Sequence, residues 1–176
     1  DTLRSSSNEL SQSMSLLHPQ VAAHLEVLGV AFEVMECDPE FADTAAFCER
    51  YRIDPADSAN TIVVASKRPP DVFGVCVALA TTRLDVNRAV RDELGVKKLS
   101  FAPSSVTLDI SGMEIGGVTP FGLPPGLTTL VDSAVMLREE IVLGGGNRTS
   151  KLRLDPAELS KLEGLRIVEG LASEIR

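Results

Sequence analysis

The sequence predicts one α+β domain built on a mixed β-sheet. Segments with strand patterns outnumber those with helix patterns, and the two kinds alternate irregularly, unlike in a doubly wound parallel sheet. The chain has 176 residues, the length of about one domain, with 44% apolar and 24% charged residues, which excludes disorder throughout. Residues 1–14 are polar and rich in serine, so we expect them to be a disordered lead and residues 15–176 to form the domain.

The first part of the predicted domain contains two helices and one strand. Pro19 suits a first helical turn, and apolar residues follow with helical spacing until Gly29. Residues 31–36 have a strand-like pattern. Asp43 is placed to cap a short helix that continues to Tyr51.

A hairpin is predicted next, because two apolar runs flank a turn. The β-branched run 61–65 is a buried strand, residues 67–71 contain two prolines and form the turn, and residues 73–80 form the second strand. A helix then follows over 85–94, with Asp85 as its cap and a glycine directly after it.

The middle of the chain is rich in short strand patterns. Residues 99–102 form a short strand, and the alternation of apolar residues over 105–110 also indicates a strand. Residues 113–118 and 127–131 have strand patterns on either side of a loop, 119–126, that is rich in glycine and proline.

The last part of the chain completes the predicted sheet. A short helix over 132–137 precedes strands over 140–143 and 152–154. A capping box with proline at the first helical position begins a helix over 155–162, and residues 167–171 form a final strand.

Composition excludes several classes of protein. The net charge of −8 is the opposite of what a protein that coats DNA or RNA needs. The longest apolar runs, such as 61–65 and 75–80, are far shorter than the roughly 18 residues of a membrane helix. Cys37, Cys48 and Cys76 are odd in number and widely spaced, which argues against a disulfide framework and predicts a cytoplasmic protein. With two histidines and no C-x-x-C motif, neither a metal nor another cofactor is predicted.

Two segments that could be reactive sites are better explained as ordinary structural features. Residues 144–151 resemble a phosphate-binding loop only superficially, because they lack the G-x-x-x-x-G-K-[ST] spacing and precede a strand. Cys37 lies between Glu36 and Asp38, whose carboxylates raise the pKa of the thiol and make it a poor nucleophile. A thiol enzyme is therefore the least favoured interpretation.

The densest cluster of glycine and proline is at residues 111–124. Paired glycines allow the backbone to approach a ligand, and Pro120 fixes the turn, so this loop could aim backbone N–H groups at a polarised carbonyl. An ordinary tight connection explains the composition equally well.

The stretch GGVTPFG at 116–122 resembles the G-x-x-x-P loop of the YbaK / prolyl-tRNA editing domain family. Other segments are similar to that family in the same order, and the resemblance covers about residues 17–171. These segments are TIVV (61–64), LGVKK (94–98), VD (131–132), the glycines at 144–146 and the stretch 154–162.

The resemblance implies both a fold and an activity. The implied fold is a curved or barrel-like mixed sheet surrounded by short helices, with a helix over 103–111 that overrules the strand pattern there. The implied activity is hydrolysis of the ester of mischarged tRNA that carries a small amino acid such as alanine, proline, serine or cysteine. No cofactor is implied. The implied partners are the aminoacylated 3′ end of tRNA and an aminoacyl-tRNA synthetase, with no DNA or membrane; the oligomeric state stays open.

The resemblance also indicates the site and where this chain departs from the family. The family has a catalytic lysine where this chain has Asn60, and Cys37 stands where some members have tyrosine. Lys67 is a poor substitute, because seven extended residues span about 23 Å and an odd offset reverses the face. The implied catalytic residues are Asn60, Gly116, Gly117, Thr119 and Asp132. The implied substrate-binding residues are Phe32, Val34, Cys37, Val118, Pro120, Phe121 and Gly145.

Two functions remain open at this point. Asn60 can donate a neutral hydrogen bond about half as strong as that of a charged lysine, so we predict weakened or altered deacylation rather than its loss. The alternative is a non-catalytic module that binds aminoacyl-tRNA or an amino acid. For Asp132, a helix cap is at least as good an interpretation as a substrate contact. Three basic clusters are predicted to flank the mouth of one pocket: Lys67, Arg68, Lys97, Lys98, Arg148, Lys151 and Arg153.

Overall fold

The computed structural model describes residues 2–176, with side chains from Ser7 onward. The α-helices are α1 (Thr2–Met14), α2 (Pro19–Leu28), α3 (Thr44–Tyr51), α4 (Arg91–Leu94) and α5 (Ser104–Ser111). Short 3-10 helices are η1 (Pro39–Phe41), η2 (Pro55–Asp57), η4 (Ser133–Leu137) and η5 (Pro156–Lys161), and η3 (Val86–Val90) is a π-helical turn. The strands are β1 (Glu33–Glu36), β2 (Ala59–Arg68), β3 (Phe73–Leu79), β4 (Thr82–Leu84), β5 (Lys98–Phe101), β6 (Thr128–Asp132), β7 (Ile141–Gly144), β8 (Ser150–Leu154), β9 (Leu165–Val168) and β10 (Ala172–Glu174).

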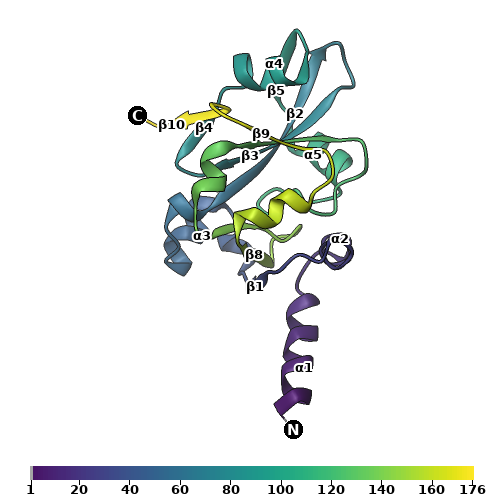
Figure 1. Ribbon diagram of the computed structural model, residues 1–176, viewed down its shortest axis with the longest axis vertical. Coiled ribbons are helices and arrows are strands. Elements are labelled where there is room, and N and C mark those ends of the chain that lie inside the picture. Colours follow the sequence, from purple (N-terminus) through teal and green to yellow (C-terminus); the bar gives the residue numbers. More distant parts are fainter. Residues whose placement is uncertain (1) are drawn as a thin grey trace.

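The main sheet has five strands in the order β5-β2-β3-β6-β9 and occupies the upper part of the molecule (Figure 1). β2 and β3 form the predicted antiparallel hairpin, whereas β3–β6 and β6–β9 pair in parallel. The sheet is therefore mixed, as predicted. The parallel pairs are possible because long connections return the chain between these strands.

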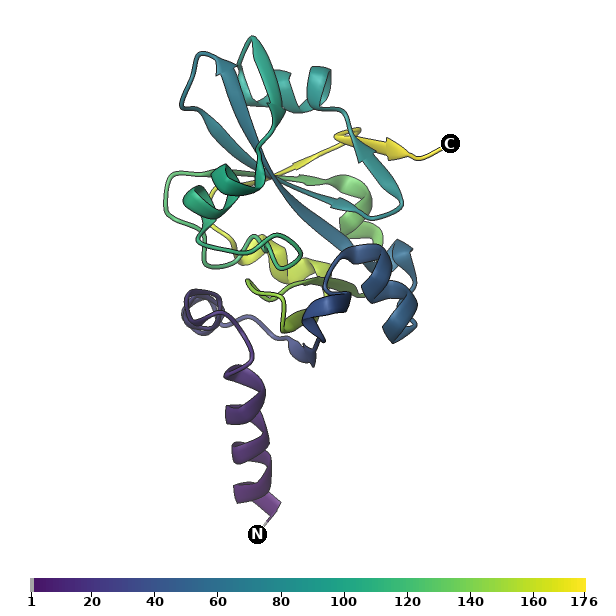
Figure 2. The ribbon, with the colours of Figure 1, turned by 180° about the vertical axis from the view of Figure 1, so that it is seen from behind.

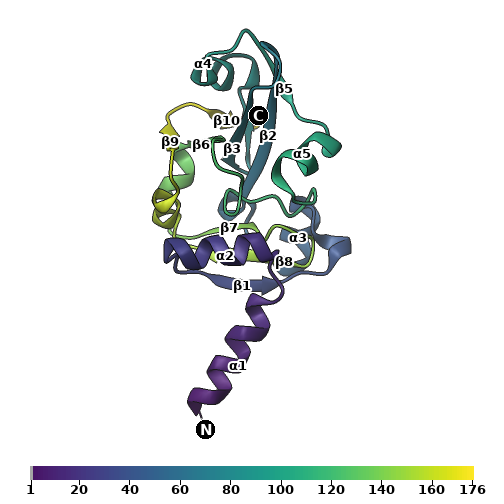
Figure 3. The same cartoon turned by 90° about the vertical axis from the view of Figure 1, so that its right-hand side faces the viewer.

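A second sheet of three antiparallel strands, β1-β8-β7, lies below the first, and α2 runs across it (Figure 3). A parallel bridge between Ser58 and Val142 joins the two sheets next to the beginning of β2. β4 and β10 form a separate antiparallel pair. The sheets stay open and form no closed barrel among the described residues, so the α+β class is confirmed and the barrel-like arrangement is not.

Three apolar clusters hold these layers together. The largest fills the space between α2, the smaller sheet and the lower end of the main sheet, and it includes Leu25, Phe121 and Leu143. A second cluster packs η3 and α4 against the main sheet, and a third surrounds Phe47 of α3. Strands from both sheets contribute to the largest cluster, which fixes the position of one sheet against the other.

The N-terminal region differs from the expectation. We expected residues 1–14 to be disordered, whereas Thr2–Met14 form α1, which projects away from the body (Figures 1 and 2); Asp1 lies outside the described residues. Met14 packs against the largest apolar cluster at the end of this helix. Leu10 and Met14 are four residues apart, so one weak helical stripe is present among the polar residues.

The strand pattern over 105–110 is wrong, and the helix that the resemblance implied is confirmed as α5. Thr107 and Ser111 are the buried residues of this helix, and the Ser111 hydroxyl donates to the Thr107 carbonyl oxygen at 2.6 Å. The alternating apolar residues do not form the buried face, and Leu108 is exposed. Residues 113–118 were also expected to be a strand, but they form turns because glycines interrupt them.

Candidate functional site

A cavity of about 270 Å³ lies where the two sheets meet. Its walls come from residues 59–63 of β2, the beginning of α3, the turn at Gly116, the ends of β7 and β8, and Thr107 of α5. These segments are far apart in the sequence, and the bridge between Ser58 and Val142 brings β2 and β7 together at one wall. Polar groups from four different segments can therefore reach one small space.

The wall formed by β2 is paired with β3 on one side, and its other side is open around Thr61, between the bridge at Ser58 and the hydrogen bond from Ala102 to Val63. β5 pairs with β2 only from Val64 onward. The Ser58 carbonyl accepts from Ala80 on the β3 side, whereas the Val63 carbonyl accepts from Ala102 on the other side. Because this direction alternates along an antiparallel strand, the N–H and C=O of Thr61 point away from β3, toward the open edge. The Thr61 hydroxyl is also buried without a hydrogen-bond partner among residues 2–176, so the wall holds unused donors and acceptors.

Asn60 lines the cavity at the same wall. The Thr44 hydroxyl at the beginning of α3 donates to Asn60 Oδ1 at 2.5 Å, which fixes the side-chain amide. The amide NH₂ donates to no residue in the described part of the chain, so it can donate to a ligand. Asn60 is one of the predicted site residues, and it lies in the cavity lining.

The opposite wall is a glycine turn that packs backbone against backbone. A Cβ at Gly117 would lie 2.0 Å from the Asn147 carbonyl oxygen, and one at Gly144 would lie 2.4 Å from the Gly117 oxygen. Gly116 has a φ of +90° and lines the cavity together with Val118. The Gly117 N–H donates to Glu114, whereas the N–H groups of Gly116 and Val118 donate to no described residue. The turn can thus offer free backbone donors to a ligand.

Lys151 of β8 was predicted to flank the mouth of the pocket, but it lies in the cavity wall. It is 6% exposed. Its Nζ donates to the carbonyl oxygens of Ala42 at 2.7 Å and Gly116 at 2.6 Å, and it lies 5.2 Å from the ring centre of Phe47. Burial lowers the pKa of this ammonium group from its ordinary value, and Cys37 and Arg148 act on the pKa in opposite directions.

Arg148 joins the loops around the mouth of the cavity. Its guanidinium donates to the carbonyl oxygens of Pro39 and Ile115, and it forms an ion pair of 3.0 Å with Asp43. One side chain therefore links η1, the beginning of α3 and the residue before the Gly116 turn. Because all of these donors bond to the protein itself, Arg148 holds the segments beside the cavity together and is not left free to bind a ligand.

Several predicted site residues lie outside the cavity lining. Gly117 and Gly145 pack behind the wall, and Thr119 is fully buried with a hydroxyl that has no hydrogen-bond partner among the described residues. The Asp132 carboxylate accepts from the Ala172 N–H, which ties β6 to β10, and it makes no cap bond to η4. Asp132 therefore has a structural partner away from the cavity.

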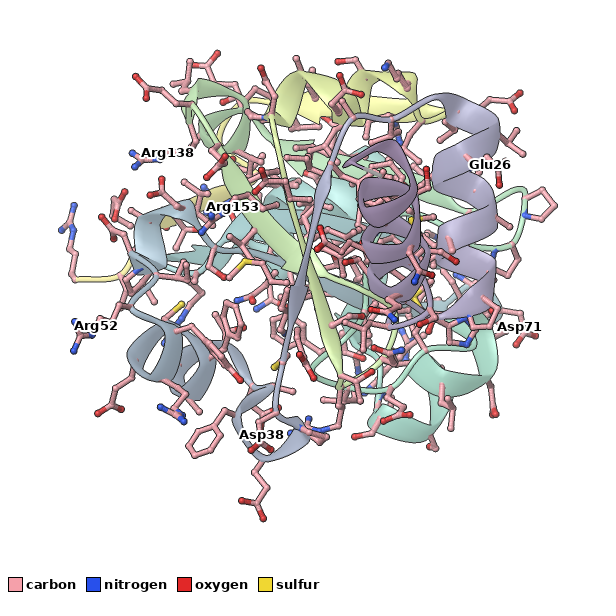
Figure 4. All side chains as sticks on the ribbon, turned by 90° about the horizontal axis from the view of Figure 1, so that it is seen from below. Glu26, Asp38, Arg52, Asp71, Arg138 and Arg153 are labelled. Atoms are coloured by element: carbon pink, nitrogen blue, oxygen red, sulfur yellow. The ribbon has the colours of Figure 1, made fainter. Side chains whose placement is uncertain are left out.

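The predicted substrate-binding residues are similarly dispersed, with Val118 alone in the lining. Phe32 and Val34 pack against the largest apolar cluster, Phe121 is fully buried within it, and Pro120 lines a different cavity. Cys37 is buried and donates to the Asp38 carbonyl, and burial raises the pKa of its thiol. Figure 4 shows Asp38 at the edge of the molecule.

The three basic clusters do not surround one mouth, contrary to the expectation. Lys97 donates its backbone N–H to Arg68, so the first two clusters meet at the far end of β2, about 23 Å or more from Asn60 along the strand. Arg153, labelled in Figure 4, forms an ion pair with Glu140 at 3.2 Å. Of the seven, Lys151 alone lines the cavity, and Arg148 is bonded to the lining residues Asp43 and Ile115.

Two kinds of feature are absent from the part of the chain that the structure describes. None of its helices combines the length and apolar character needed to cross a membrane. Within residues 2–176, His, Cys, Asp and Glu side chains form no group of three or more that could hold a metal ion.

Comparisons with known proteins agree with the fold. The model of the aminoacyl-tRNA editing domain family matches residues 38–162. The uncharacterized protein YwhH of Bacillus subtilis (strain 168) is 34% identical over 85 residues, which are 48% of this chain; the match spans about half of that protein, 53% of its length.

Two solved structures have the same fold over most of their length. The hypothetical protein APE2540 has a TM-score of 0.78 at 19% identity, over 88% of this chain and 99% of that one. The crystal structure of "a putative trans-editing enzyme for prolyl tRNA synthetase" has a TM-score of 0.74 at 21% identity, over 87% of this chain and 97% of that one.

Proposed function

The chain belongs to the aminoacyl-tRNA editing domain family, and from this premise we propose that its cavity hydrolyses the ester of a mischarged aminoacyl-tRNA. The observation that carries the proposal is the cavity itself, which has donors on both walls and, on the β2 wall, acceptors that no described residue uses. Asn60 and the Gly116 turn supply donors, and Thr61 supplies a carbonyl and a hydroxyl. An aminoacyl ester needs both, because its carbonyl accepts hydrogen bonds and its ammonium group donates them.

The reaction needs positioning and stabilisation of charge. Water attacks the carbonyl carbon, negative charge develops on the carbonyl oxygen, and the bond between the carbon and the ribose oxygen breaks. One water proton passes to the ribose oxygen, and the other is released as the amino acid ionises. Fixed donors that face the developing oxyanion lower this barrier, and the Asn60 amide and the N–H groups of Gly116 and Val118 are suited to that position.

We further propose a small amino acid as the substrate and the cytoplasm as the place of action. A cavity of about 270 Å³ is smaller than the roughly 300–1,000 Å³ of sites that hold drug-sized ligands, which favours alanine, proline, serine or cysteine. The partner is the aminoacylated 3′ end of tRNA, delivered with or without a synthetase. With a net charge of −8, the protein is expected to bind tRNA weakly and with strong dependence on salt.

Incubation with a panel of aminoacyl-tRNAs tests the proposal. We expect deacylation above the buffer rate for at least one small amino acid. Asn60→Ala should lower this rate about tenfold, since the loss of one neutral hydrogen bond costs about 1.4 kcal/mol. Lys67→Ala, a matched change of an exposed residue on the same strand, should leave the rate unchanged. A panel in which no amino acid is released faster than in buffer would contradict the proposal.

The second candidate is a binding module without catalysis. It is favoured by Asn60, a neutral residue where the resemblance places a lysine. A non-hydrolysable aminoacyl-adenosine distinguishes the two: binding in the micromolar range or tighter, together with no turnover of the corresponding ester, selects the module.

A further inference from the structure

Lys151 is difficult to explain as a purely structural residue. Burial of an ammonium group is costly unless it is paired with an opposite charge. Among the described residues, its hydrogen-bond acceptors are two neutral carbonyls, and the nearby carboxylate of Asp43 is engaged by Arg148. A methionine of similar length would fill the same space without a charge. The cavity therefore retains a cation with which no carboxylate of the described residues forms an ion pair.

The geometry of the ammonium group leaves one donor for a ligand. Lys has three N–H donors, and Ala42 and Gly116 take two of them. These two bonds and the face of Phe47 fix the position of Nζ, and Lys151 itself lines the cavity. Gly116, the acceptor of one bond, lies in the same turn as Val118; both residues line the cavity, and their N–H groups donate to no described residue.

We propose that Lys151 is a catalytic residue that donates this third hydrogen bond to the carbonyl oxygen of the aminoacyl ester and stabilises the oxyanion formed there. The ligand class is thus a polarised or anionic oxygen. This inference rests on the proposed function, and it assigns the positive charge of the site to β8, on the wall opposite Asn60. The proton stays on Lys151 throughout, so the step of hydrolysis described above keeps its balance.

A second lysine, Lys161, has a similar contact to a backbone carbonyl and provides a control for Lys151. Lys161 of η5 is a matched control, because its Nζ also donates to a backbone carbonyl, that of Gly29 at 2.8 Å, but it lies outside the cavity lining. Lys151→Met removes one charge and two bonds to carbonyls, and Lys161→Met removes one charge, one bond to a carbonyl and an ion pair of 2.7 Å with Glu158. A loss of activity that is specific to Lys151→Met cannot come from the net charge alone.

Single-turnover deacylation is the first measurement. We expect Lys151→Met to lower the rate constant by about 10²-fold or more, the usual effect of removing one oxyanion donor, and Lys161→Met to change it less than threefold. Affinity for the tRNA should stay within a few-fold of the original. A rate for Lys151→Met within threefold of the original would overturn the proposal.

The pH dependence of the deacylation rate distinguishes a role of the Lys151 charge from a purely structural role of its side chain. Burial lowers the pKa of Lys151, so the ammonium is lost at a lower pH than for an exposed lysine. The groups that act on it are Cys37, Cys48, Asp43 and Arg148. After subtraction of the buffer rate, activity should fall as pH rises through this lowered pKa. Lys151→Met should lack this alkaline fall, and the same fall in Lys151→Met would contradict the assignment.

Binding of a transition-state analogue keeps the test independent of turnover. A tetrahedral phosphonate analogue of aminoacyl-adenosine carries an anionic oxygen, whereas the matched carboxamide is neutral. We expect the folded protein to prefer the phosphonate by at least tenfold, and Lys151→Met to lose this preference. If Lys151→Met does not fold, Lys151→Ala with added ethylammonium replaces it, and recovery of the preference supports the proposal. Equal preference in the original protein and the variant overturns it, even if no ester is hydrolysed.

Discussion

Gly117→Ala should reduce the free energy of unfolding by about 3 kcal/mol or more, the upper range for overpacking a tightly packed position. The added Cβ would lie 2.0 Å from the Asn147 carbonyl oxygen, 2.4 Å from its carbonyl carbon and 2.6 Å from its nitrogen. All three atoms belong to the backbone, so no side chain can rotate away. The loop around Asn147 would have to separate from the turn, which would also break the 2.6 Å hydrogen bond from Gly146 to Gly117.

Urea denaturation of Gly117→Ala beside Gly164→Ala measures this effect. Gly164 has a φ of +72°, and no atom lies within 4 Å of the place that an added methyl group would take, so alanine there should cost only about 1 kcal/mol through backbone strain. Equal losses for the two variants would show that the Gly116 turn and the loop after β7 do not pack as described. A selective loss for Gly117 would establish that this contact holds one wall of the cavity.

Phe121→Ala should have a comparable effect for a different reason. Phe121 is fully buried in the largest apolar cluster, and its ring contacts His24 of α2 edge to face at 6.4 Å. Removing a buried phenylalanine costs about 3–5 kcal/mol through lost transfer free energy and the cavity left behind. The Gly122 N–H next to it donates to His24, so the attachment of α2 should weaken as well.

Phe101→Ala is the matched control, because its side chain is 53% exposed on β5. We expect a loss below about 1 kcal/mol there, measured by the same denaturation curves. A third variant, Phe121→Leu, tests whether Phe121 contacts the substrate, as the resemblance implies. Phe121→Leu should keep most of the stability and leave the deacylation rate and the KM unchanged. A KM raised tenfold in the folded Phe121→Leu protein would instead place this ring at the substrate.

Local sequence patterns predicted much of the fold because they report local chemistry. Proline and glycine mark both ends of α2, and the β-branched run and the turn after it predict the hairpin of β2 and β3. The pattern over α5 failed because alternation of three apolar residues is a weak signal, and their burial depends on which face the rest of the fold covers. In that helix, small polar residues are the buried ones.

The candidate site was predictable in part, because local patterns and the resemblance identify some of its residues. Asn60 and Gly116 were found through the resemblance, which carries positional information that spacing alone lacks. Lys151 was placed with surface cations because a lysine in a short strand is ordinarily exposed. Its burial depends on β8 lying between β1 and β7, where Lys151 is opposite Met35 and Gly144. Met35 is more than a hundred residues from Lys151 in the sequence, so this pairing cannot be predicted from local patterns.

The walls of the cavity also determine when it can exist during folding. Residues near positions 43, 60, 116 and 150 must all be in place, so the cavity closes only after contacts between distant parts of the chain have formed. No isolated hairpin or helix pair contains it. A ligand of the cavity would therefore bind the native state alone and stabilise the entire domain, by about 2.7 kcal/mol at a hundredfold excess over its Kd. Thermal melting with candidate aminoacyl analogues thus offers a search for the ligand that requires no turnover.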